Sequence, residues 1–98
     1  RFLTIQPGQA LTMLNSEWMQ QQASALLERV EREVGNNLEN QAERCLELVT
    51  CKSAQAEDVQ ELVDLVDRLQ RQHAVSDRKA RHAMCLVALN VNPFFYID

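Results

Sequence analysis

Five side chains of this 98-residue chain are of the types that bind soft metal ions, namely two histidines and three cysteines: His73, His82, Cys45, Cys51 and Cys85. A zinc site needs several such ligands, and common sites include a CxxC pair or an HExxH helix. The sequence has neither spacing, and only His82 and Cys85 are close enough to share one face of a helix. We therefore predict that the chain binds no metal and needs no cofactor.

Nucleophilic catalysis requires a serine or cysteine beside a histidine and a carboxylate, in a pocket with donors for an oxyanion. No local motif supplies this arrangement, and with only two glycines in the chain there is no glycine-rich phosphate loop. The carboxylates are spread along expected helix faces, where they are normally solvated. We therefore predict that the protein is not an enzyme.

The clearest charge feature is a basic segment, residues 68–82, which holds five of the ten lysine and arginine residues. Arg78 and Lys79 would lie in the first turn of a helix, where cations oppose the helix dipole at a cost on the order of a few tenths of a kcal/mol each. The segment is therefore a candidate site for an anion or a partner, formed by Arg68, Arg71, Arg78, Lys79, Arg81 and His82. The alternative is a solvated junction whose arginines pair with carboxylates of the same chain, namely Glu57, Asp64 or Asp67.

A general nucleic-acid binder would need a positive long-range potential, whereas the net charge here is -4. The basic segment contains no aromatic residue, so it offers no platform for stacking bases. A recognition helix over 77–91 would carry basic residues only near its first turn. Phosphate contact is thus favoured over sequence readout, and nucleic acid is a less favoured partner than protein.

The elements that must position these residues are predicted to be helices. Glycine and proline, which punctuate strand-rich folds, occur only twice each, while Ala, Leu, Gln, Glu and Arg are abundant. Apolar residues recur at steps of three and four. We predict one all-α domain over residues 1–98, a bundle of three to four helices at about 9–34, 37–51, 54–74 and 77–91.

The junctions between these helices have recognisable capping residues. Ser16 can start a fresh helix inside the first segment, and Gly35 can close that segment before Asn36 or Asn37 caps the next. Ser53 is expected to cap the third helix. Its seam contains Val59, Leu62, Val66, Leu69 and His73, and the first four of these are predicted to be buried in the core.

A break at residues 74–77 is expected to separate the third and fourth helices. Because no glycine or proline lies between Asn36 and Asn92, one continuous helix from Ser53 to Asn90 is the alternative.

Both ends of the chain are apolar. Residues 1–8 are expected to form an arm, and residues 92–98 a tail containing Phe94, Phe95, Tyr96 and Ile97. The tail either closes the chain's own bundle or fills a groove on a second copy. Because one small core can hardly cover both ends, we predict self-association through the tail or through the far half of residues 53–91, most simply as a two-fold dimer.

Since the chain begins with Arg1 rather than methionine, we expect a processed product or a fragment. No apolar run is long enough to span a membrane, and three cysteines argue against a disulfide-stapled scaffold, so we expect reduced thiols in the cytoplasm. The sequence predicts a protein-protein interaction module, such as an adaptor, regulatory, chaperone-like or assembly subunit, that binds through apolar helix faces. The alternative is a small regulatory protein that contacts nucleic acid or another anion through residues 68–82.

Overall fold

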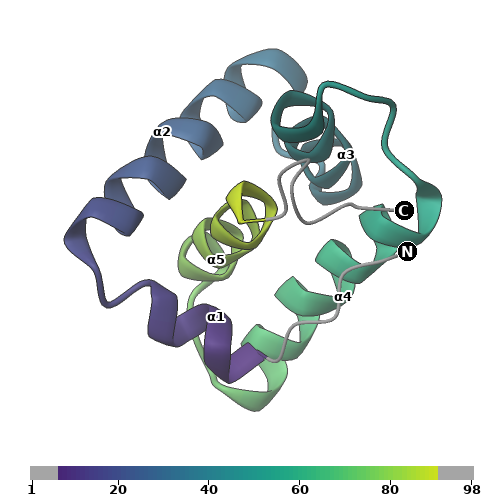
Figure 1. The fold of residues 1–98 in the computed structure, drawn as a ribbon. Helices are drawn as coiled ribbons and strands as arrows, with labels where there is room; N and C mark the ends of the chain where they lie inside the picture. Colours follow the sequence, from purple (N-terminus) through teal and green to yellow (C-terminus); the bar gives the residue numbers. More distant parts are fainter. Residues whose placement is uncertain (1–6, 91–98) are drawn as a thin grey trace.

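The computed structural model describes residues 7–90, which form five α-helices and no β-strand (Figure 1). The helices are α1 (Pro7–Met13), α2 (Glu17–Val34), α3 (Leu38–Thr50), α4 (Ala56–Gln72) and α5 (Asp77–Leu89). The predicted all-α class is confirmed. The predicted count of three to four helices was too low, because the first predicted helix is divided in two.

The division between α1 and α2 lies at Ser16, the second start that the sequence predicted. The Ser16 hydroxyl accepts a hydrogen bond from the backbone N–H of Met19 at 3.3 Å and so caps α2. The Gln20 side-chain amide donates to the Leu14 carbonyl and ties α2 to the turn. The apolar residues before and after this turn therefore belong to two helices.

The junction between α2 and α3 follows the predicted capping pattern. Gly35 has a φ of 79°, and its N–H donates to the Glu31 carbonyl at 2.9 Å. Asn37 then caps α3 by accepting from the Asn40 N–H at 2.9 Å. A residue with a side chain would be strained at Gly35, so this glycine permits the reversal of the chain.

The seam of α4 is confirmed at Leu62, Val66 and Leu69, which are buried, while Val59 is only partly buried. Its predicted extension to His73 was wrong: His73 is exposed, because α4 ends at Gln72 and His73 follows it as the C-cap.

The predicted start of α4 was also wrong. The helix begins at Ala56, and its N-cap is Gln55 rather than Ser53. The Gln55 side chain makes no capping hydrogen bond.

The predicted break between α4 and α5 is confirmed, so the alternative of one continuous helix is wrong. Ala74 has a φ of 53°, a left-handed conformation that no helix contains. Ser76 then caps α5 by accepting from the Lys79 N–H at 3.2 Å.

Helix α5 lies at the centre of the fold and contacts each of the other four helices, which surround it in Figure 1. A helix that is apolar on most sides is normally buried in this way. Small residues let its neighbours approach closely. Its buried positions are Ala80, Ala83, Met84, Cys85, Leu86, Val87 and Ala88.

None of the helices within residues 7–90 is both long and apolar enough to cross a membrane. The predicted N-terminal arm lies almost entirely outside the described residues, as does the predicted apolar tail at 92–98.

Candidate functional site

Three arginines of the basic segment pair with carboxylates of the same chain. Arg71 contacts Asp67 one turn earlier in α4 at 3.1 Å. Arg78, in the first turn of α5, contacts Glu31 of α2 at 2.8 Å. This second pair joins two helices and offsets the unfavourable position of a cation at a helix N-terminus.

Arg81 takes part in a polar network that reaches the buried interior. It contacts Asp77 at 2.9 Å, and its Nη1 donates to the Asn36 carbonyl at 2.9 Å and to Gln41 Oε1 at 2.7 Å. The fully buried Gln41 amide in turn donates to the Gly35 carbonyl at 2.6 Å. We call Gly35, Gln41 and Arg81 the junction network, because it holds the start of α5 against the turn between α2 and α3.

Two further basic side chains of this segment, Lys79 and Arg68, are not paired with carboxylates of the described residues. Within residues 7–90, the Lys79 ammonium and the Arg68 guanidinium have no hydrogen-bonding or ion-pair partner. Lys79 is exposed, and Arg68 is partly buried on α4. The structure therefore does not gather the six predicted residues around one anion: Arg71, Arg78 and Arg81 are paired with carboxylates instead.

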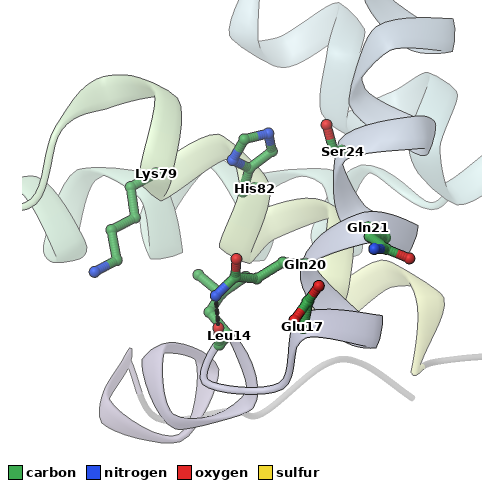
Figure 2. A pocket seen from close by; sticks show the side chains of 7 residues that line it. All are labelled: Leu14, Glu17, Gln20, Gln21, Ser24, Lys79 and His82. Atoms are coloured by element: carbon green, nitrogen blue, oxygen red, sulfur yellow. Dashed lines mark hydrogen bonds between the residues drawn. The ribbon is translucent and has the colours of Figure 1, made fainter.

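A groove of about 400 Å³ lies between the first half of α2 and the start of α5. Figure 2 shows Lys79 and His82 entering from α5 and the other polar side chains from α2, with Leu14 at the turn between α1 and α2. Six of the seven residues that line it are polar or charged: the lining is formed by Leu14, Glu17, Gln20, Gln21, Ser24, Lys79 and His82.

His82 is the most unusual side chain of the groove. Its Nε2 is inaccessible to solvent and has no hydrogen-bond partner among the described residues. Burial and the nearby charge of Arg78 lower the pKa of His82, and Glu31 and Glu28 oppose this shift only in part. The imidazole is thus held in its neutral form near pH 7, with one ring nitrogen unused.

Trp18 lies in the first turn of α2 and is 64% exposed. It is the one large hydrophobic side chain among the described residues that is exposed. Gln21, three residues later, lines the groove, so the indole and the groove occupy adjacent parts of the surface. We call Trp18 together with the groove residues the α2 surface.

The three cysteines and two histidines do not all gather at one place. Cys45 and Cys85 are buried with their sulfur atoms 3.6 Å apart, while Cys51 is exposed at the end of α3. Among the described residues, no three His, Cys, Asp or Glu side chains gather closely enough to hold a metal ion.

Residues 1–66 match the family described as "PSD1: Protein of unknown function (DUF1553)". The chain belongs to this family. The matched residues cover α1, α2, α3 and the first part of α4, whereas the central helix α5 lies beyond the match. No curated protein matches the chain. No solved structure matches it either.

Sequence reasoning named Lys79, His82 and Arg81 as candidate site residues, but it missed the α2 residues of the α2 surface and the part of Gln41 in the junction network. Trp18 could have been found from its place in α2, because it lies off the stripe through Ala23, Leu27 and Val30 that faces the core. Gln41 precedes Cys45 by four residues on the apolar face of α3, and a polar residue in such a stripe signals a buried hydrogen bond. The four predicted self-association residues, Phe94, Phe95, Tyr96 and Ile97, lie outside the described residues.

Proposed function

We propose that this protein is a non-enzymatic protein-protein interaction module, of the adaptor, regulatory, chaperone-like or assembly kind, and that it binds through the α2 surface. The observation that carries the proposal is the exposure of Trp18, 64% of whose surface is accessible. Tryptophan is strongly enriched among the residues that dominate binding energy at protein interfaces, because it buries a large area and its N–H needs a partner.

The neighbouring groove supports this proposal. Interfaces commonly surround an aromatic anchor with polar side chains that hydrogen-bond to the partner. Here, Gln21 of α2 supplies such a group next to the indole, and Ser24 of α2 and Lys79 of α5 supply further ones in the groove. The apolar faces of α2, α3, α4 and α5 pack mainly into the protein's own core. They therefore leave less apolar surface for a partner than the sequence suggested.

The partner we propose is a second copy of the chain, in a two-fold dimer. Trp18 is the only tryptophan, so its fluorescence reports on this surface alone. With rising concentration, we expect light scattering to approach twice the monomer mass while the indole emission shifts to the blue as water is excluded.

A matched pair of variants tests the role of the indole. Trp18→Gln should weaken association at least about tenfold, as expected for an interface hot spot. Glu43→Gln, at an exposed position on α3 outside the α2 surface, should leave association unchanged. A parent protein that stays monomeric at high micromolar concentration would refute the proposed dimer.

The apolar tail is the second proposed contribution to self-association. Phe94, Phe95, Tyr96 and Ile97 together carry a large apolar area that is costly to leave in water. Deletion of residues 94–98 should shift the protein towards monomer or cause it to aggregate. Arg78→Ala should leave assembly intact, because Arg78 is engaged with Glu31.

Anion or nucleic-acid contact is the alternative function, and the specific observation in its favour is the Lys79 ammonium beside the groove. A duplex held by this side chain and Arg68 should dissociate steeply as salt rises. Binding to a second copy through Trp18 should depend little on salt. Titration of a fluorescent DNA duplex at two salt concentrations, with Lys79→Gln for comparison, separates the two functions.

The cellular location we propose is the cytoplasm, based on the odd number of cysteines. Fractionation of cells that express the full-length protein tests this location. Recovery from an extracytoplasmic compartment would contradict it.

A further inference from the structure

Two of the three cysteines are brought together by helices that are far apart in the sequence. Cys45 of α3 and Cys85 of α5 are 40 residues apart, yet their sulfur atoms lie 3.6 Å from each other. Both residues are fully buried. A disulfide has an S–S length of about 2.05 Å, so the two sulfur atoms need to approach by only about 1.6 Å to bond.

We propose that Cys45 and Cys85 form a redox-dependent disulfide site that crosslinks α3 to the central helix α5, with Cys51 left as a free thiol. Cys51 is exposed and lies one residue beyond the end of α3 in a left-handed conformation. Cys51 is the one thiol that remains after the pair has formed.

The oxidant class is a small-molecule disulfide such as oxidised glutathione. One cysteine thiolate attacks it, forming a mixed disulfide and releasing one glutathione thiolate. The second cysteine thiolate then attacks the protein sulfur of the mixed disulfide and expels the second glutathione. In total, two protein thiols lose two electrons and two protons, one protein disulfide forms, and one oxidised glutathione becomes two reduced glutathione molecules.

Folding controls when this reaction takes place. The contact with Cys45 and burial raise the pKa of the Cys85 thiol, so the reactive thiolate is scarce in the folded protein. The central position of α5 also keeps oxidants away from Cys85. The crosslink therefore forms when the chain folds in the presence of the oxidant, and the protein that is already folded and reduced oxidises slowly.

The experiment refolds the full chain from urea in a mixture of reduced and oxidised glutathione, in parallel with refolding in reductant. Alkylation after unfolding should then modify one thiol in the oxidised protein and three in the reduced protein. Cleavage after glutamate places the three cysteines on separate fragments, 44–47, 48–57 and 62–98. A disulfide that joins fragments 44–47 and 62–98 is the expected product.

The crosslink should also raise the melting temperature. Closing a loop of this length restricts the unfolded chain, and we expect an increase of about 10 to 25 °C in Tm. Cys51→Ser is the matched control, which should form the same disulfide and show the same increase. In Cys85→Ala, the Tm should not depend on the oxidant.

Three results would overturn the proposal. They are a disulfide that includes fragment 48–57, the absence of any intramolecular disulfide after oxidative refolding, and a crosslinked protein no more stable than the reduced one. Because the last comparison uses the unmutated chain in two redox states, it does not depend on whether a cysteine variant folds.

Discussion

Arg81 of α5 donates a hydrogen bond of 2.7 Å to the side-chain oxygen of Gln41, which lies fully buried on α3. The Gln41 side-chain amide in turn donates a hydrogen bond to the Gly35 carbonyl at the end of α2. The Gln41 side chain thus provides hydrogen-bond partners for both the Arg81 guanidinium and the Gly35 carbonyl, at the point where α2, α3 and α5 meet. The basic residue that the sequence suggested for anion binding has a structural role here.

The first prediction concerns this pair. Gln41→Leu should lower the free energy of unfolding by about 1 to 3 kcal/mol, because it leaves the Gly35 carbonyl and part of the Arg81 guanidinium without partners. Urea denaturation of Gln41→Leu, Arg81→Met and the double variant forms a cycle that measures the coupling between the two residues. Additive effects would show that the hydrogen bond contributes nothing to stability.

The second prediction concerns the buried seam of α4. Leu62→Ala or Leu69→Ala should cost about 2 to 5 kcal/mol, because each side chain is almost fully buried and its removal leaves a cavity. Val59→Ala provides the comparison: it shortens a side chain on the same helix that is only partly buried, and should cost less. Chemical denaturation checks all three, and a leucine variant as stable as the parent would contradict the assignment.

The helical stripes were predictable because periodicity depends on local residue order, as in Ala23, Leu27 and Val30 of α2. The break before α5 was harder to predict, because Ala74 adopts a positive φ that glycine usually provides. The exposure of His73 could not be read from spacing, since it depends on where α4 ends. The meeting of Cys45 with Cys85 depends on packing between distant segments, which local patterns do not specify.

The third prediction uses the imperfect start of α4. Ser16, Asn37 and Ser76 cap their helices through side-chain oxygens, whereas the Gln55 side chain makes no such bond. Gln55 already has the extended backbone conformation of an N-cap, with φ −79° and ψ 139°. Gln55→Ser should therefore stabilise the protein by about 0.5 to 1 kcal/mol.

Ser76→Ala is the opposite test of capping. It removes the acceptor for the Lys79 N–H and should destabilise the protein by about 1 kcal/mol. Thermal denaturation of both variants should show shifts of opposite sign. A rise in Tm for Ser76→Ala would contradict the assigned cap.

The fourth prediction is that the free energy of unfolding decreases as the pH is lowered, because His82 is protonated more readily in the unfolded chain than in the folded protein. Its pKa is lowered from the ordinary value of 6.5, first by burial and then by the charge of Arg78, so the folded state favours the neutral ring more than the unfolded chain does. Protonation therefore favours unfolding. The contribution of the neutral ring is fully present above about pH 6.5 and is lost as the pH falls below this value.

Urea denaturation of the parent and of His82→Gln, between about pH 7.5 and pH 5, measures this contribution. The parent should lose stability across this range more steeply than His82→Gln, which has no proton to bind there. His73→Gln is the control, because His73 is exposed and this variant should follow the parent. Hydrogen bonds from Arg44 and Arg29 lower the pKa of Glu33 below 4.5. The stabilising effect of ionised Glu33 is therefore lost only at a pH more acidic than the measured range. Equal slopes for the parent and His82→Gln would show that the buried imidazole does not control the response to acid.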